Sequence, residues 1–218
     1  MICIILMFLA LVILLVAEYR HLKTLIWLSK PAASTLFLFY AVSQGSLHHT
    51  YGKWILVALV LSWIGDVLLI KSDSKVFFQS GLVSFLLAHV AYILAFFHAG
   101  LSDVHQLIAS GSYLLVGGVG FLISRWLMPY VKAKDSKMIL PVWAYMIVIS
   151  FMVLCAIEVT LQSGHRMVLV GAIVFYLSDI AVAREQFVQK SFINKLWGLP
   201  FYYAAQMMMA STITSLVR

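Results

Sequence analysis

Charged residues are scarce in this chain of 218 residues, in which 11% of positions are charged and 63% are hydrophobic. The mean hydropathy is +1.01. A soluble domain of this size would leave much of that apolar surface in water, so the composition is typical of a protein that crosses a membrane several times. No polar stretch is long enough to form a second, soluble domain. We therefore expect residues 1–218 to form a single transmembrane domain.

Cysteine is also rare, and several catalytic motifs are missing. The two cysteines, Cys3 and Cys155, lie inside apolar runs, which argues against a disulfide framework or a metal cluster. The chain has no G-x-S-x-G elbow, no H-E-x-x-H and no Walker A motif, so serine-type acyl transfer has no support in the motifs. We expect no metal and no cofactor.

The net charge of +7 does not predict nucleic-acid binding, because the basic residues are spread through short loops and form no aromatic-basic patch. Membrane topology explains them better. The sequence predicts no protein partner.

Eight apolar segments follow one another along the chain. Most have close to the ~20 residues that a spanning helix requires. Backbone groups in hydrocarbon must pair within their own segment, so each segment is predicted to be helical. The first segment lacks a basic leader and an A-x-A cleavage site, and we expect it to be a retained span. The fold prediction is an all-α polytopic membrane protein with a single bundle of eight transmembrane helices, at about 2–17, 24–42, 54–70, 78–98, 107–124, 138–159, 167–183 and 196–217.

The cations are distributed unequally between alternate loops. Eleven of the fifteen Lys and Arg residues fall on the side of the odd-to-even loops, three fall on the other side, and Lys30 lies within the second span. Because cytoplasmic loops are enriched in cations, this bias predicts that both termini lie outside. We expect an integral protein of the bacterial inner (cytoplasmic) membrane.

Two apolar segments carry an aspartate in similar surroundings. Residues 63–71 read WIGDVLLIK and residues 176–184 read YLSDIAVAR. Asp66 and Asp179 both lie twelve residues into spans that run from outside to inside, which predicts the same depth, roughly 6–8 Å below the cytoplasmic boundary. A carboxylate inside a span costs ~2.5–3.5 kcal/mol on insertion scales. Two aspartates at matched depth favour one shared site; the alternative is a buried pair that fixes helix packing through hydroxyl groups.

Further polar side chains within the spans are candidates for the same site. Lys30 precedes Pro31 near the cytoplasmic end of its span, where it can snorkel to the headgroups, pair with an aspartate or hold a phosphate. The others are aromatic or polar residues that can line a pocket or bond one another. They are His89, Tyr92, Tyr145, Tyr202 and Gln206.

Two carboxyl groups in one pocket of low dielectric constant suit acid/base catalysis, because one can stay protonated while its partner is ionised. The predicted depth is that of a lipid's glycerol linkage, within reach of water from the cytoplasm. The residues therefore favour a hydrolase that acts on a lipid near its headgroup, and they do not identify the bond.

Taken together, the motifs resemble those of the YhhN-like lysoplasmalogenase family of eight-span membrane enzymes. The matching stretches cover essentially the whole chain in order: SKP at 29–31, GDVLL at 65–69, GLVSFLLAHVAYILAFF at 81–97, YMIVISFM at 145–152, GAIVFYLSDIAVAREQF at 171–187 and YYAAQ at 202–206.

This resemblance implies hydrolysis of the sn-1 vinyl ether bond of a lysoplasmalogen to a fatty aldehyde and glycerophosphoethanolamine or glycerophosphocholine. A vinyl ether is hydrolysed by protonation of its β-carbon, followed by capture of the oxocarbenium ion by water. We expect one of Asp66 and Asp179 to donate the proton and the other to stabilise the cation, without assigning which does which. Lys30, His89, Tyr92, Tyr145, Tyr202 and Gln206 are the expected substrate-binding residues.

Two other functions compete with this interpretation. An intramembrane aspartyl protease also uses two aspartates, but Trp63 replaces the first glycine of its G-x-G-D motif, and no Pro-Ala-Leu motif occurs. A lipid-binding protein or proton-coupled transporter without hydrolase activity is the main alternative, although no Pro/Gly-broken helix pair marks a midplane site.

Overall fold

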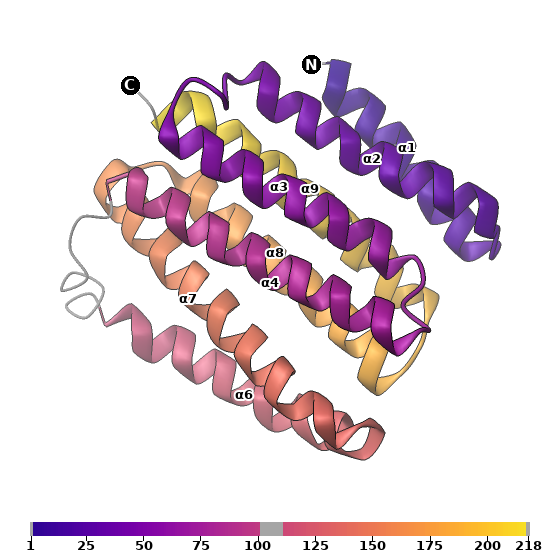
Figure 1. The fold of residues 1–218 in the computed structure, drawn as a ribbon. Coiled ribbons are helices and arrows are strands. Elements are labelled where there is room, and N and C mark those ends of the chain that lie inside the picture. The colour runs from indigo at the N-terminus through magenta and orange to yellow at the C-terminus, as the bar shows by residue number, and fades with distance from the viewer. Residues whose placement is uncertain (1, 101–110, 217–218) are drawn as a thin grey trace.

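The computed structural model describes residues 2–100 and 111–216, and within these ranges it contains eight α-helices and no strands (Figure 1). The all-α prediction is confirmed. A 3-10 turn, η1 (Ser136–Met138), and a π-helical turn, η2 (Arg184–Val188), join onto neighbouring helices. The helices are α1 (Ile2–Tyr19), α2 (Lys23–Ser43), α3 (Thr50–Leu69), α4 (Lys75–His98), α6 (Ser112–Lys134), α7 (Ile139–Ser163), α8 (Arg166–Ala183) and α9 (Phe192–Leu216).

Seven of these helices are long and apolar enough to cross a membrane, all except α9. At 25 residues α9 extends for ~37 Å, more than the ~30 Å of a hydrocarbon core. Its polar residues Asn194, Gln206 and Thr212 lower its average hydropathy, yet they are buried within the bundle. The eighth span therefore stays a prediction.

The prediction for the fifth segment was wrong at its C-terminal end. The segment was expected to end at residue 124, whereas α6 continues to Lys134. Arg125 and the following cations were interpreted as a loop, but charged side chains at a membrane boundary do not interrupt helical hydrogen bonding. Its expected start, at residues 107–110, lies outside the described residues. The other helix ends fall within about four residues of the predicted ones, the usual uncertainty of such boundaries.

The helices form a bundle in which α9 occupies a central place. The closest pairs are α3 with α4 and α8 with α9. Helix α9 also contacts α1, α2 and α3, while α6 lies at an edge of the bundle and packs against α7 (Figure 1). A helix surrounded by others can turn polar groups inward at little cost, because neighbouring helices supply their hydrogen-bond partners.

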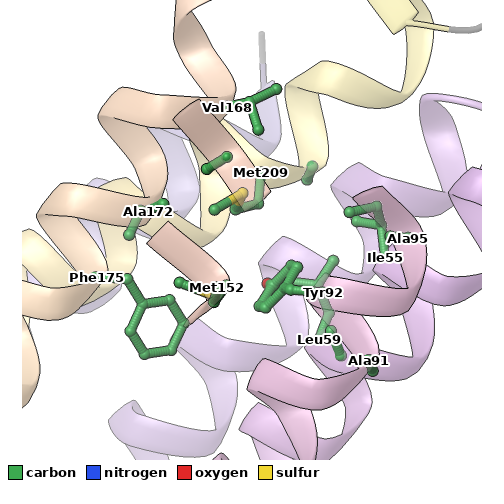
Figure 2. Close-up of a cluster of buried hydrophobic side chains, with 14 of the residues drawn as sticks. Ile55, Leu59, Ala91, Tyr92, Ala95, Met152, Val168, Ala172, Phe175 and Met209 are labelled. Carbon is green, nitrogen blue, oxygen red and sulfur yellow. The ribbon is translucent and has the colours of Figure 1, made fainter. Parts of the chain in front are cut away.

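The interior and exterior are both apolar, as expected of a protein whose solvent is lipid. Figure 2 shows buried side chains from α3, α4, α7, α8 and α9 meeting around Tyr92 and Phe175. On the outside of α6, Leu114 and Leu115 are each 69% exposed, and Leu122 is 67% exposed. Soluble proteins rarely present such continuous apolar surface, whereas a lipid-facing helix requires it.

Helices α8 and α9 approach each other closely at Gly198. A Cβ atom placed on Gly198 would lie only 2.6 Å from the Cβ of Ala181. Both residues line the cavity described below, so this contact helps to set the spacing of its walls.

We expect Gly198→Ala to lower the stability of the folded protein by about 1–3 kcal/mol, because the added methyl group would overlap the side chain of Ala181 and force α8 and α9 apart. The matched control is Gly117→Ala in α6, where a Cβ would meet nothing within 4 Å. That change should be neutral or stabilising by up to about 1 kcal/mol. Thermal unfolding in detergent measures both; equal melting temperatures for the two variants would contradict the close approach.

Candidate functional site

One large cavity reaches both intramembrane aspartates. Its volume is about 940 Å³, and Asp66 of α3 and Asp179 of α8 both contribute to its wall. It extends to the end of the bundle that carries the α1–α2, α3–α4 and α8–α9 connections, because residues of these turns also line it. The sequence predicted these connections to be cytoplasmic.

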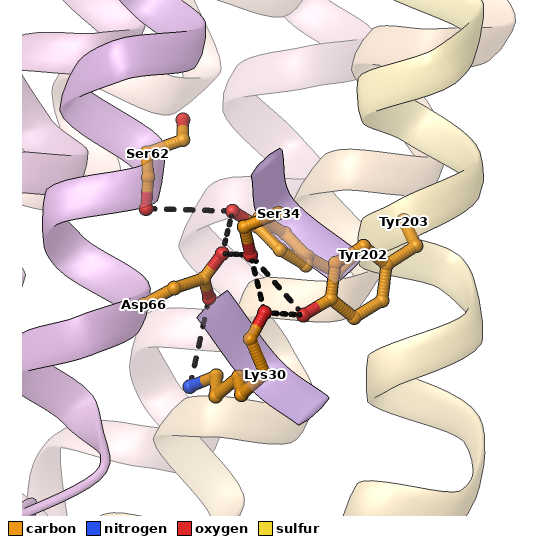
Figure 3. Close-up of polar contacts among 6 residues, drawn as sticks. All are labelled: Lys30, Ser34, Ser62, Asp66, Tyr202 and Tyr203. Atoms are coloured by element: carbon orange, nitrogen blue, oxygen red, sulfur yellow. Dashed lines mark hydrogen bonds and ion pairs between the residues drawn. The ribbon is translucent and has the colours of Figure 1, made fainter. Parts of the chain in front are cut away.

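Asp66 lies deep in the wall and is only 2% exposed. Its Oδ2 accepts hydrogen bonds from Ser34 Oγ and Tyr202 Oη, each at 2.6 Å. Its Oδ1 lies 3.5 Å from Lys30 Nζ (Figure 3). The three partners come from α2 and α9, so this carboxyl joins the consecutive helices α2 and α3 to α9, which is distant in sequence.

A second layer of contacts holds the partners of Asp66 in place. Ser34 Oγ lies 3.0 Å from the carbonyl oxygen of Lys30 and 3.2 Å from Tyr203 Oη. Tyr203 Oη also lies 3.3 Å from the same carbonyl oxygen. Figure 3 shows these hydroxyls converging on one turn of α2. The donors that face Asp66 are therefore positioned by the packing of α2 against α9.

The neighbours of Asp66 favour its ionised form. An ammonium group can only donate, and the two hydroxyls donate at distances typical of bonds to a carboxylate. Each such bond contributes about 1.5–3 kcal/mol. Lys30 is 8% exposed, so its charge is also largely removed from water and is balanced by Asp66.

Asp179 has fewer partners and is more open to the cavity. Its side chain is 17% exposed, against 3% for Asp66. Its Oδ2 accepts a hydrogen bond from Tyr145 Oη at 2.7 Å and lies 3.5 Å from His89 Nε2. Among the described residues, none hydrogen-bonds its Oδ1.

His89 stands behind Asp179 and is not part of the cavity wall. It is completely buried, and its ring packs against those of Tyr145 and Phe175, with centroids 5.2 and 4.6 Å away. Its Nδ1 lies 2.6 Å from the backbone oxygen of Phe85. A carbonyl oxygen only accepts, so Nδ1 must carry a hydrogen.

Aromatic rings connect the surroundings of the two aspartates. Phe175 contacts His89 on one side and Tyr202 on the other, with centroids 4.6 and 5.7 Å away. The ring of Phe85 also packs on Tyr202, at 5.8 Å. The two carboxyl groups thus occupy one cavity with different polar environments.

Three predicted substrate-binding residues do not line the cavity: His89, which stands behind Asp179, and the pair Tyr92 and Gln206. Tyr92 donates a hydrogen bond of 2.5 Å to Gln206 Oε1, and both side chains are completely buried. They join α4 to α9 inside the core and do not line the cavity. We therefore leave them out of the proposed site.

Ion pairs border the open end of the cavity. Lys195 Nζ lies 2.6 Å from Glu18 Oε2 and joins α9 to α1. Lys190 pairs with Asp73, and this hydrogen bond together with the nearby positive charge lowers the pKa of the Asp73 carboxyl.

Two other lysines, Lys23 and Lys71, line the same end of the cavity. Lys71 Nζ lies 5.7 Å from the centroid of the Trp27 ring and 5.2 Å from that of Phe77. Contacts of this kind hold a cation at the membrane interface, where it can meet an anionic group.

The π-helical turn η2 shapes one rim of the opening. Glu185 Oε2 accepts hydrogen bonds from the backbone N–H of Ser191 and from Asn194 Nδ2, both at 2.8 Å. These bonds tie η2 to the start of α9. Turns of this type are frequent at functional sites.

Sequence reasoning missed Ser34. Serine is common at helix contacts in membranes, so Ser34 carried little signal by itself. Its spacing of four residues from Lys30 placed both side chains on one face of α2 and was the only indication available.

Within residues 2–100 and 111–216, no three His, Cys, Asp or Glu side chains gather into a possible metal site.

The fold and the cavity together define an all-helical membrane protein with two carboxyl groups on the wall of one cavity near an end of its bundle. The chain belongs to the YhhN family, whose sequence model matches residues 25–213. The resemblance found in the sequence is thus confirmed, and the matched region includes every predicted site residue.

Curated relatives of this chain are named lysoplasmalogenases. Lysoplasmalogenase TMEM86B of Rattus norvegicus is 27% identical over 181 residues, which cover 83% of this chain and 68% of the rat protein. Lysoplasmalogenases of Mycobacterium bovis and Mycobacterium tuberculosis are 30% identical over 168 residues, covering 75% of this chain and 61% of theirs. The chain thus matches less than two thirds of the length of the mycobacterial relatives. No solved structure matches it.

We expect Lys30→Met to lower the free energy of unfolding by about 3–5 kcal/mol, because it leaves the Asp66 carboxylate buried without its counter-charge. Adding Asp66→Asn to this variant should recover part of the loss. The matched control is Lys75→Met, which removes the partner of Asp135 in a pair whose lysine side chain is 54% exposed. This control should cost less than about 1 kcal/mol.

Unfolding of the four proteins in detergent measures these differences. A double variant no more stable than Lys30→Met alone would show that Asp66 is not held as a carboxylate.

Proposed function

We propose that this protein is a lysoplasmalogenase, which hydrolyses the sn-1 vinyl ether bond of a lysoplasmalogen to a fatty aldehyde and a glycerophosphoethanolamine or glycerophosphocholine. The observation that carries the proposal is the presence of Asp66 and Asp179 on the wall of one cavity. The names of the rat and mycobacterial relatives support the choice of substrate. At about 940 Å³ the cavity falls within the ~300–1,000 Å³ usual for small-molecule sites.

The proposed orientation of the substrate follows from the distribution of charge. The cations Lys23 and Lys71 line the open end, and the aspartates lie deeper. We expect the phosphate at the open end, the vinyl ether beside the aspartates and the alkenyl chain against the apolar wall. Lys30 is close enough to Asp66 to serve as its counter-ion, which favours that role over phosphate binding.

The proposed reaction uses one aspartate as a general acid and the other as an anion. The acid protonates the β-carbon of the vinyl ether, and the resulting oxocarbenium ion is stabilised by the neighbouring carboxylate. Water adds to the cation, and the hemiacetal collapses to the aldehyde and the glycerol hydroxyl. Tyr145 and Tyr202 hold the carboxyl oxygens in position.

We also propose that all eight helices span the membrane, with both termini outside and the cavity open toward the cytoplasmic leaflet. The cationic connections at the open end of the cavity support this orientation.

Purified protein should release aldehyde from a vinyl-ether lysolipid and leave the matched alkyl-ether and acyl lysolipids intact, because only the vinyl ether forms a stabilised cation on protonation. Chromatographic measurement of aldehyde and of free fatty acid separates the three cases. Tight binding of all three without turnover would instead favour a lipid-binding protein or transporter.

We expect Asp66→Asn and Asp179→Asn each to lower kcat by at least ~10²-fold, because a positioned acid or base contributes an acceleration of that size. The matched control is Glu158→Gln, since Glu158 is a carboxyl that is 2% exposed in α7 but does not line the cavity. Turnover is measured on variants that retain the wild-type helical circular dichroism. Near wild-type turnover in either aspartate variant would remove the pair from catalysis.

A further inference from the structure

The two aspartates face opposite kinds of neighbour, and this difference bears on their roles. Asp66 meets three donors: two hydroxyls at 2.6 Å and the Lys30 ammonium at 3.5 Å. A proton on Asp66 would be directed against groups that are already donating. The site therefore holds Asp66 as an anion.

Asp179 faces Nε2 of His89, a nitrogen that has no hydrogen-bond donor of its own in the described part of the chain. Nδ1 of His89 uses its hydrogen on the Phe85 carbonyl, so a neutral His89 presents a lone pair at Nε2. That atom is buried, has no hydrogen-bond partner among the described residues and lies 3.5 Å from Asp179 Oδ2. A lone pair facing a carboxylate is repulsive, and a proton between the two atoms removes the repulsion.

We infer that Asp179 is the proton donor of the reaction, that His89 is a positioning residue which keeps this proton on Asp179, and that Asp66 is the anion which stabilises the cation. This assignment rests on the proposed function for its substrate. The protonation pattern itself follows from the contacts alone. In the resting enzyme His89 is neutral, because an imidazolium buried away from water would carry a large desolvation cost.

The greater exposure of Asp179 agrees with this assignment. Its side chain is 17% exposed to the cavity, and no described residue bonds its Oδ1. Tyr145 and His89 both face Oδ2 of Asp179. The terminal torsion of an aspartate is broad, so the carboxyl can turn the protonated Oδ2 from His89 to the substrate and bring Oδ1 to Tyr145 in its place.

The proton balance closes within the site. Asp179 gives its proton to the β-carbon, and the electron pair of the double bond forms the new C–H bond. Water adds to the oxocarbenium carbon and returns one proton to the Asp179 carboxylate. Collapse of the hemiacetal breaks the bond to the glycerol oxygen; this oxygen takes a proton from Asp179, and the hemiacetal hydroxyl gives one back. Asp66 stays ionised throughout.

Infrared spectroscopy tests the protonation pattern without any turnover. Near neutral pH the wild type should show the carbonyl stretch of a protonated carboxyl, which disappears in Asp179→Asn and remains in Asp66→Asn. Glu158→Gln removes any contribution from the other buried carboxyl. Loss of the band in Asp66→Asn and its survival in Asp179→Asn would overturn the assignment, whatever the substrate is.

Chemical rescue tests the catalytic roles separately. Asp179→Ala should regain at least ~10-fold in rate with added formic acid, and the gain should grow as the pH is lowered, because the protonated acid replaces the missing donor. Asp66→Ala should respond to the formate anion, with a gain that grows as the pH is raised. The opposite pH trends would exchange the two roles. A wild type that releases no aldehyde would refute the proposed function and leave the infrared result to decide the proton's position.

The role of His89 is tested with His89→Gln, which places an amide donor opposite Asp179. We expect kcat to fall ~10- to 100-fold, with KM changed less than about threefold, since His89 does not line the cavity. Because the amide favours the carboxylate, activity should also be lost at a lower pH than in the wild type.

His98→Gln, on the exposed end of the same helix, is the matched control and should keep the wild-type kcat and pH profile. A purely structural His89 would lower the melting temperature and leave both kcat and the pH profile unchanged. The titratable groups that face the His89–Asp179 pair from neighbouring elements remain in the variant. They are Tyr145 of α7, which hydrogen-bonds Asp179, and Tyr176 of α8. Asp66, Lys30 and Tyr202 line the same cavity as Asp179 and also remain.

Discussion

Burying a carboxylate among apolar helices is so costly that its compensation organises the whole structure. Asp66 obtains that compensation from a lysine and two hydroxyls on α2 and α9, and it thereby joins α2 and α3 to α9, which is far from both in sequence. The central position of α9 meets the same need for hydrogen-bond partners. This helix supplies the buried Tyr202 and Tyr203, and the helices around it provide groups with which they can bond. Stability and chemistry therefore depend on the same contacts.

The second aspartate is not a copy of the first, although their sequence surroundings are alike. Asp179 has one hydroxyl donor, a buried histidine behind it and an oxygen open to the cavity. Acid catalysis needs such a difference, since two carboxyl groups in identical environments would not divide into an acid and an anion. Both carboxyl groups nevertheless lie on one cavity wall. Phe175 packs between the ring of Tyr202, a partner of Asp66, and that of His89, which stands behind Asp179.

Local patterns predicted the helices well and the polar contacts only in part. The positions and lengths of the helices follow from the apolar runs, because hydropathy is a property of each segment by itself. The end of α6 was wrong because cations at a boundary were interpreted as a break. Tyr92 and Gln206 were grouped with the site because they are polar and intramembrane, yet they hydrogen-bond each other in the core. Ser34 was overlooked because a lone serine in a span has many uses.

The sequence by itself determined that the chain is helical and apolar, that two of its apolar segments each carry an aspartate near their cationic end, and that the chain resembles the YhhN family. These properties depend on residue type and on spacing along one helix. Only the tertiary structure decided which donors surround each carboxyl, that His89 stands behind Asp179, and that Lys30 lies beside Asp66. The reason is physical: the partner of a buried charge is chosen by the rotation and packing of separate helices, and these are set by the whole bundle at once.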